Sequence, residues 1–289
     1  IDLGTNADND LENQLNDDWF AIGIKAQLES YDEGYFRSSE YSGYEPELNV
    51  SYEIPSNEVN ITGCTNLNQA GKIYRLTQDI TDSSTSPCMN ISANDVTLDC
   101  QGHSIDSDTG YDIDEGVLVK DVINITIKNC TVSEWGTNYV GAIKIENVNN
   151  SRFIHLNITN NWDKGIYFFK SYNNNLSDSY LIGNGVDAIY FSSSSNNTVF
   201  NNFFNNSDNF GATADSNNFL NTTNQTGTRI YTSGNYIGGN YWANPSGTGF
   251  SQTCSDSDGD GFCDEVYNAT TDSSCTPGTD CGNTVDYLP

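Results

Sequence analysis

The stretch NNLSDSYL at residues 174–181 recurs in pattern as NTVFNNFF at residues 197–204, and this repeat decides the fold. Apolar positions upstream recur with the same spacing in two columns, Ile143, Ile166 and Ile189, and Ile145, Phe168 and Phe191. Inside each short run apolar and polar residues alternate, which is typical of a β-strand. A fixed period of about 23 residues indicates a solenoid, and the Asn and Ser runs between the strands favour turns. The sequence therefore predicts a parallel β-helix.

Two more columns place the remaining strands of each coil. They share the successive intervals 26, 23 and 23 and consist of Ile127, Phe153, Leu176 and Val199, and of Val132, Ile158, Leu181 and Phe204. Together the columns define roughly six coils, from near Ile73 to near Leu220. Alternation predicts that these columns are buried, whereas Tyr167 and Tyr190 face outward, stacked one above the other beside Lys144. A slip of one residue would exchange the buried and exposed sets.

The composition indicates an exported protein with few anionic partners. The formal net charge is −28, with only 11 Lys and Arg among 289 residues, so we expect no binding to nucleic acid or to anionic membranes. No apolar run of about 18 residues occurs, so no transmembrane segment is expected. The chain begins at Ile1 without a basic leader. We therefore expect a mature, secreted protein that is extracellular or attached to the cell surface.

The eight cysteines support the same compartment, because an even number fits an oxidising exterior. Their spacing does not match a zinc site. Cys100 and Cys130 end equivalent strands of stacked coils, so we pair them, and we pair Cys64 with Cys88 across the first coil. Each bridge closes a loop and should thereby stabilise the folded state by about 3 kcal/mol. Cys254, Cys263, Cys275 and Cys281 allow three pairings, of which we favour Cys254–Cys263 and Cys275–Cys281.

The strongest chemical pattern is DSDGDGFCD at residues 256–264. Oxygen ligands at alternate positions, followed by Gly261 at the sixth, form the first half of an EF-hand-type calcium loop. The twelfth position is Tyr267 instead of the usual Glu, so Asp264, Glu265 or Asp286 must complete the sphere. The predicted ligands are Asp256, Asp258, Asp260, the Phe262 carbonyl, Asp264 and Asp286. Calcium would be structural here, and the alternative is a solvated acidic loop.

Several of these segments resemble one family. Residues 240–242 (NYW), the Asp loop, Tyr267 and the closing residues 286–289 (DYLP) are similar to the C-terminal end of NosD-type β-helix proteins, especially archaeal surface proteins. Residues 74–80, residues 96–105 and the repeated coils extend the resemblance to roughly residues 60–289. It implies a right-handed parallel β-helix. The family name carries a copper association, but this chain has one Met, two His and no ligand cluster, so we do not expect copper.

The resemblance and the repeat together divide the chain into three parts. Residues 56–226 form the β-helix, and residues 227–289 form a C-terminal cap with the calcium loop. Residues 1–55 contain three strand candidates, at 18–25, 34–41 and 46–52, which resemble the end of a jelly-roll module of surface proteins. Three strands leave an apolar face and open edges. This sheet is either the remnant of a longer domain, docked on its own β-helix, or completed by a neighbouring chain.

The many Asn-x-Ser/Thr sequences offer sites for N-linked glycans in a secreted protein. Asn is also favoured at solenoid turns, so the excess of these sequences is modest. The glycosylation candidates are Asn60, Asn90, Asn124, Asn157, Asn196 and Asn268.

Catalysis is the main alternative, because parallel β-helices include carbohydrate-active lyases, hydrolases and epimerases. Inverting hydrolysis needs two carboxylates about 6.5–9.5 Å apart. Asp163 and Asp187 fall in turns, and their spacing differs by one residue from the period of the repeat. The signatures of polygalacturonases are missing. A carboxylate pair with an adjacent Arg on one strand face would favour an enzyme. A passive alternative is that the outward Tyr column binds sugar rings.

We therefore predict a non-catalytic structural or adhesive protein of an envelope layer, sheath or extracellular filament. The partners expected are identical chains or other surface proteins, with possible glycans. Stiff coils, disulfides, glycans and calcium would all stabilise an extracellular protein against unfolding and proteolysis. Residues 1–55 are the predicted contact for assembly, because a partner strand would satisfy their open edges.

Overall fold

The computed structural model describes residues 57–108, 114–136, 140–213, 215–268 and 285–289. The compact unit to which they belong spans Pro55–Pro289. The strands predicted within residues 1–55, and the predicted Cys275–Cys281 bridge, lie outside the described residues.

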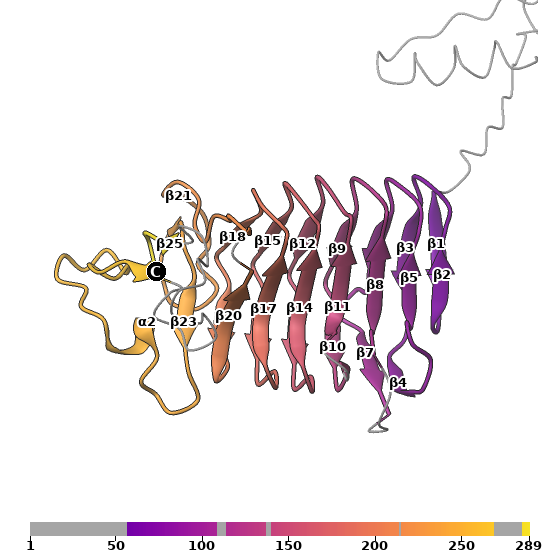
Figure 1. The fold of residues 1–289 in the computed structure, drawn as a ribbon, viewed down its shortest axis with the longest axis horizontal. Helices are drawn as coiled ribbons and strands as arrows, with labels where there is room; N and C mark the ends of the chain where they lie inside the picture. The colour runs from indigo at the N-terminus through magenta and orange to yellow at the C-terminus, as the bar shows by residue number, and fades with distance from the viewer. Residues whose placement is uncertain (1–56, 109–113, 137–139, 214, 269–284) are drawn as a thin grey trace, which may run out of the picture. The chain divides into compact units, whose positions relative to one another are not determined.

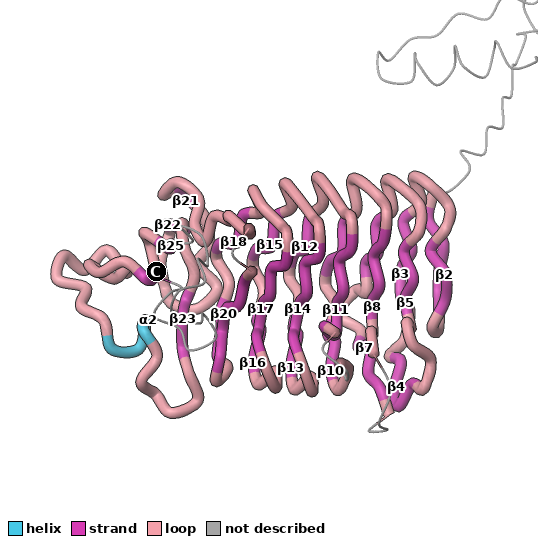
Figure 2. Tube along the Cα trace, in the orientation of Figure 1, coloured by secondary structure: helices cyan, strands magenta, loops and turns pink. Residues whose placement is uncertain are grey.

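The described unit is a parallel β-helix of about six turns, built from three sheets of seven strands each. The chain visits the three sheets in turn, so each strand pairs in parallel with the strands one coil before and one coil after it (Figures 1 and 2). In the most regular coils Ile143 is the register partner of Ile166, and Ile166 is that of Ile189. This is the interval of the sequence repeat, so the predicted fold and its period are confirmed.

The strands of the three sheets have the following bounds. Sheet A contains β1 (Glu58–Ile61), β3 (Ile73–Leu76), β6 (Thr97–Asp99), β9 (Thr126–Lys128), β12 (Arg152–Ile154), β15 (Asn175–Ser177) and β18 (Thr198–Phe200). Sheet B contains β2 (Thr65–Leu67), β5 (Met89–Ile91), β8 (Val117–Lys120), β11 (Gly141–Glu146), β14 (Lys164–Phe169), β17 (Asp187–Ser192) and β20 (Asp208–Ala212). Sheet C contains β4 (Ile80–Ser83), β7 (Ser104–Ser107), β10 (Thr131–Ser133), β13 (Asn157–Thr159), β16 (Tyr180–Ile182), β19 (Phe203–Asn205) and β23 (Tyr241–Ala243).

Short elements close the C-terminal end. Two antiparallel pairs, β21 (Gln225–Thr226) with β22 (Tyr236–Ile237) and β24 (Tyr267–Asn268) with β25 (Val285–Asp286), flank the helix α2 (Phe250–Thr253). Trp242 stacks between Phe204 and Tyr267 with ring centroids 4.5 and 4.2 Å away. These rings cover the last coil and keep its apolar interior away from water.

The register of the coils is the predicted one. The inward positions are almost completely buried, at Ile143, Phe153, Ile166, Leu176, Ile189 and Val199. Tyr167 and Tyr190 are half-buried on the outer face of sheet B, with ring centroids 5.6 Å apart, and Lys144 is the register partner of Tyr167. Aromatic rings also stack inside, where Phe168 and Phe191 lie 4.9 Å apart. The repeat thus produces a continuous apolar core along the axis.

Asn and Ser side chains form internal ladders at the corners of the coils. Asn197 is typical, because its Nδ2 donates to the Ser171 carbonyl and to Asn218 Oδ1, both at 2.9 Å. Its Oδ1 in turn accepts the Asn174 backbone N–H at 3.0 Å. A second ladder runs through Asn161, Asn184, Asn206 and Asn209. These ladders satisfy buried backbone groups that the corners would otherwise leave without hydrogen bonds.

Other Asn residues occupy corner positions with left-handed backbone angles, which Asn tolerates better than most residues. They are Asn124, Asn129, Asn147, Asn150, Asn160, Asn173, Asn196 and Asn201. The abundance of Asn therefore has two separate causes, the internal ladders and the left-handed corners.

Three disulfides are present, with the predicted pairings Cys64–Cys88, Cys100–Cys130 and Cys254–Cys263. The first two join adjacent coils across Cα separations of 4.4 and 4.8 Å, close to the interstrand spacing.

The periodic columns do not mark the two ends of the coil stack. The first coil begins at β1 and β2, before the first apolar column near Ile73, and its strands carry too few apolar residues to show the repeat. At the other end β23 pairs with β19 as the last strand of sheet C, although it lies within the predicted cap. A loop of irregular length separates β23 from the preceding coil and hides its place in the repeat.

Candidate metal site

The Asp loop at residues 256–264 is shaped by two glycines with left-handed backbone angles. Gly259 has φ +73° and Gly261 has φ +86°, which non-glycine residues adopt only with strain. Their N–H groups donate to the two carboxylate oxygens of Asp256 at 2.8 and 3.0 Å. The loop therefore wraps around the Asp256 side chain, as the predicted sharp turn at Gly261 requires.

Within this loop Asp256, Asp258 and Asp260 converge. Each offers a carboxylate oxygen within 4.8 Å of the others, and all three residues are exposed. Asp258 accepts the Asp260 N–H and Asp260 accepts the Phe262 N–H, so short backbone bonds fix the side chains. Three carboxylates without nitrogen or sulfur donors suit a hard cation such as Ca²⁺, Mg²⁺ or Mn²⁺. This group could bind a metal ion.

The other predicted ligands lie nearby but are engaged differently. Asp264 accepts hydrogen bonds from the Ser257 N–H at 3.0 Å and from its hydroxyl at 2.6 Å. Glu265 accepts the Ser255 N–H at 3.1 Å. The Phe262 side chain is buried, and ligation by its carbonyl stays a prediction. Among the described residues, the carboxylate group within 4.8 Å contains neither Asp264 nor Glu265.

The prediction of Asp286 as a ligand is not supported, because the structure places this residue in the core. Its carboxylate is completely buried and accepts four N–H groups, from Asn240 (backbone 2.8 Å, side chain 3.3 Å), Trp242 Nε1 (2.9 Å) and Leu288 (3.0 Å). Burial raises the pKa of Asp286 to about 7, against the opposing effect of these donors. Asp286 ties the tail to the last coil instead of to the Asp loop.

Arg229 supports the Asp loop from behind, and sequence reasoning missed it. Its guanidinium donates to the carbonyls of Gly261 (2.7 Å) and Asp260 (3.4 Å), and lies 4.2 Å from the centre of the Phe262 ring. The residue is almost fully buried. Arg229 and Asp260 lie far apart in the chain and no repeat links them, so the sequence carries no signal for this contact.

The six glycosylation candidates lie on the surface. Asn60, Asn124, Asn157, Asn196 and Asn268 are exposed, whereas Asn90 is half-buried and donates its amide to Asn66. Attachment of glycans to them stays a prediction.

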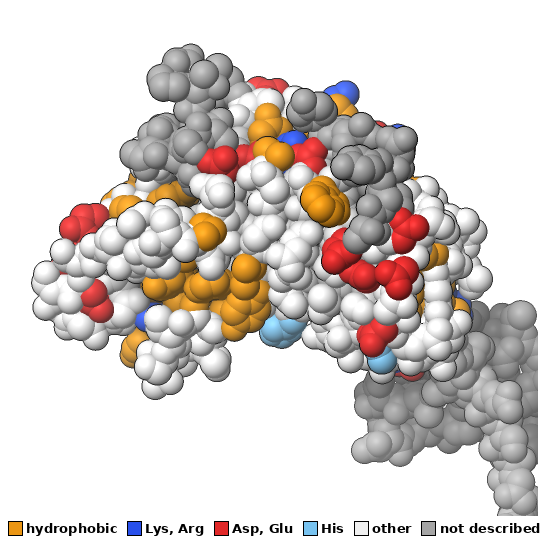
Figure 3. Space-filling model, turned by 90° about the horizontal axis from the view of Figure 1, so that it is seen from below, with side chains coloured by type: hydrophobic (Ala, Val, Ile, Leu, Met, Phe, Trp, Pro, Cys, Tyr) orange, Lys and Arg blue, Asp and Glu red, His pale blue; other side chains and the backbone are white. Residues whose placement is uncertain are grey.

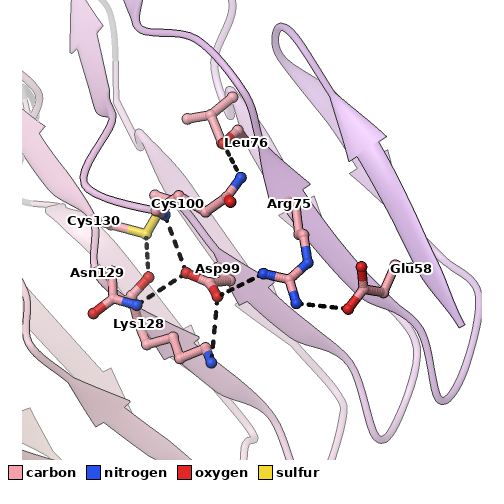
Figure 4. A network of polar contacts seen from close by, with 9 residues as sticks. Glu58, Arg75, Leu76, Asp99, Cys100, Lys128, Asn129 and Cys130 are labelled. Atoms are coloured by element: carbon pink, nitrogen blue, oxygen red, sulfur yellow. Dashed lines mark hydrogen bonds and ion pairs between the residues drawn. A yellow bond between two sulfur atoms is a disulfide. The ribbon is translucent and has the colours of Figure 1, made fainter.

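The outer face of sheet A carries the arrangement that would favour an enzyme, a carboxylate pair beside an Arg (Figure 4). Arg75 lies between Glu58 at 2.6 Å and Asp99 at 3.5 Å, and Lys128 approaches Asp99 at 3.3 Å. Burial opposes ionisation of Asp99, but hydrogen bonds from Asn129 and Gln101 and the Lys128 ammonium keep its pKa below the usual value. The hydrogen bond from Arg75 lowers the pKa of Glu58. Both acids therefore stay ionised, which suits an ion-pair ladder better than a general acid.

A second charged group lies at the start of the sheet B strands. Lys164 and Asp163 are both buried and form an ion pair of 2.9 Å. Asp187 is also buried, and it begins β17 one coil later. The Lys164 ammonium lies 5.2 Å from the centre of the Tyr190 ring, which links this group to the outward Tyr column. Asp163 thus forms a buried ion pair with Lys164, and Asp187 lies in a strand instead of the expected turn.

Comparison with known proteins gives a family match and distant structural likenesses. The family described as "Periplasmic copper-binding protein (NosD)" matches residues 35–247. No protein with a curated description matches the sequence. Among the described residues no helix is long and apolar enough to cross a membrane.

Two solved structures illustrate the likeness in fold. Tailspike protein 2 from an Escherichia coli O157:H7 bacteriophage is 15% identical, with a TM-score of 0.42, covering 68% of this chain and 30% of the tailspike. The A-module of mannuronan C-5 epimerase AlgE4 from Azotobacter vinelandii is 12% identical, with a TM-score of 0.18, covering 52% of this chain and 67% of that one. The chain thus spans about a third of the tailspike. These likenesses concern the fold and carry no argument about activity.

Proposed function

The chain belongs to the NosD family, whose match covers well over half of its length, and from this premise we propose that it is an exported, non-catalytic β-helix protein of the cell surface. It acts as a stiff structural or adhesive unit whose C-terminal cap is held by calcium. The description of the family as periplasmic supports export. The three disulfides of the described coils and cap support an oxidising location.

The copper named in the family description does not fit the described residues. Met89 is buried in the core, His103 is bonded to Asp79, the exposed His155 belongs to no metal-ligand cluster of the described residues, and the six described cysteines are all in disulfides. The carboxylate group of the Asp loop is the metal-ligand cluster found in the described part of the chain. Copper prefers imidazole and sulfur ligands, so this group favours a harder ion.

Calcium is the ion that fits the Asp loop best. The three exposed carboxylates suit Ca²⁺, which accepts six to eight oxygen ligands in variable geometry, better than Mg²⁺, which demands a strict octahedron. Calorimetric titration should give a dissociation constant of about 10⁻⁴–10⁻³ M for calcium, typical of extracellular sites. Asp258→Asn should abolish binding, whereas Asp121→Asn, at an exposed corner of the β-helix, should leave it unchanged. Absence of binding at millimolar calcium would contradict the proposal.

The observation that best supports a structural role is the uninterrupted stack of coils. Every inner layer is apolar, every described corner ladder is hydrogen-bonded, and the C-terminal end is covered by Trp242 and Tyr267. At the N-terminal end, no described strand pairs with the outer edges of β1 and β2. Assembly at this end, with residues 1–55 contributing to the contact, would satisfy these edges.

Negative-stain microscopy and light scattering test this role. The full chain should form ordered, concentration-dependent assemblies, and a chain lacking residues 1–55 should remain folded but monomeric. Unchanged association of the shorter chain would place the contact elsewhere. A full chain that stays monomeric at all concentrations would refute the structural role, and release of reducing ends from a polysaccharide would show catalysis instead.

A further inference from the structure

A cavity of about 290 Å³ lies between the end of sheet C and the Asp loop. Its wall includes Arg229, Tyr231, Ser233, Tyr241, Ser251 and Phe262. It combines flat aromatic surfaces with a few hydroxyl groups and one guanidinium. Such a combination is typical of ligand sites, in which polar groups orient a molecule that packs on apolar walls.

An aromatic ladder on the outer face of sheet C leads to this cavity. Tyr180, Phe203 and Tyr241 are register partners on β16, β19 and β23, with successive ring centroids 5.9 and 5.3 Å apart. Tyr231 continues the row 5.4 Å beyond Tyr241. Figure 3 looks onto this side of the molecule and shows hydrophobic side chains gathered in a hollow. Phe203 and Tyr241 are stacked face to face and the other two pairs are tilted, so the row presents mainly apolar ring edges, one ring per coil.

Arg229 supplies a buried positive charge at the cavity wall. The guanidinium has five N–H donors, and four of them donate to protein acceptors: the carbonyls of Tyr236, Gly261 and Asp260 and the Thr232 hydroxyl. One donor is left, and among the described residues no carboxylate lies within ion-pair distance of Arg229. Buried charges are normally paired with an opposite charge. A ligand carboxylate would provide that partner.

The acidic residue nearest to the cavity does not fill this role. Asp256 lines the cavity, but both of its oxygens accept N–H groups of its own loop, from Gly259 and Gly261. Burial raises the pKa of the Tyr231 hydroxyl, so this group stays neutral and can exchange hydrogen bonds with an uncharged hydroxyl.

We propose that the cavity binds a uronic acid unit of an acidic saccharide, with the carboxylate on Arg229 and the sugar ring against Tyr231 and Tyr241. Pyranose rings have apolar faces that stack on aromatic rings, and their hydroxyls suit Ser233 and Ser251. Further sugar units would extend over Phe203 and Tyr180. A peptide ending in a carboxylate fits less well, because it would use Arg229 alone and leave the row of aromatic rings without a partner. The site goes beyond the proposed structural role and does not require assembly, but its wall includes Asp256 and Phe262 of the Asp loop.

The test uses the full chain and three tetrasaccharides, of galacturonate, mannuronate and glucuronate, each compared with its fully methyl-esterified form. The ester keeps the ring and removes the charge. Titration calorimetry should give a dissociation constant of about 1 mM or tighter for at least one acid, and binding about tenfold weaker or more for its ester. Equal binding of acid and ester, or no binding of any acid, would overturn the proposal.

Two variants locate the site. Arg229→Lys keeps the charge but loses the remaining guanidinium N–H that would donate to the ligand carboxylate, and it should weaken binding about tenfold. Because Arg229 also holds the Asp loop, Tyr231→Ala serves as an independent variant and should weaken binding by a similar factor. Tyr190→Ala, in the Tyr column of sheet B, should bind like the unchanged protein. Loss of binding in Tyr190→Ala alone, or binding of a free-carboxylate tetrapeptide but of no saccharide, would refute the assignment.

Discussion

Replacing Asn197 by Ala tests whether the corner ladders stabilise the β-helix. The Asn197 side chain is almost fully buried and serves two backbone groups, the Asn174 N–H and the Ser171 carbonyl. Neither group has another partner among the described hydrogen bonds outside the strands. The side chains of Asn174 and Asn218 each keep a second bond, to the Val148 carbonyl and from the Asn197 N–H. The substitution therefore leaves two buried backbone groups unsatisfied.

Each unsatisfied group costs about 1–3 kcal/mol, so we expect the free energy of unfolding to fall by about 4 kcal/mol. Urea unfolding followed by circular dichroism measures this change. Asn175→Ala is the matched control, because Asn175 is exposed on β15 and should change stability by less than about 0.5 kcal/mol. A loss below about 1 kcal/mol for Asn197→Ala, or equal losses for both variants, would refute the reasoning.

Three further predictions address the core, a disulfide and the cap. Ile166→Asp should cost several kcal/mol in the same unfolding assay, because an unpaired charge would enter a completely buried layer, whereas Tyr167→Asp on the outer face should cost much less. Replacing Cys100 and Cys130 by Ser should lower the free energy of unfolding by about 3 kcal/mol, and an unchanged midpoint would show that the coils do not need the bridge. Burial raises the pKa of Asp286 to about 7, so the folded cap binds a proton more tightly than the unfolded chain. Protection of the residue 286–288 amides against hydrogen exchange should therefore fall as pH rises from about 4 to 7, and Asp286→Asn should remove this slope; protection that rises with pH would contradict the shift.

The repeat in the sequence determined the β-helix, its register and two of its disulfides. In a solenoid each residue contacts the residues one coil away, so a contact appears in the sequence as a fixed interval. The columns through Ile166 and Leu176 show this interval directly, and alternation within each strand assigns the buried face. Cys100 and Cys130 could be paired because both end equivalent strands. The Asp loop could also be found, because its ligands lie next to one another in the chain.

Only the tertiary structure decided how the C-terminal cap is built. Asp286 bonds to Asn240 and Trp242, which lie far from it in the chain, and Arg229 reaches across to the distant Asp loop. These contacts occur once and have no periodic signal. They depend on how irregular loops close over the last coil, so a residue that resembles a calcium ligand can lie in the core. The cavity lined by Tyr231 and Pro289 exists only because that closure brings the two ends of the cap together.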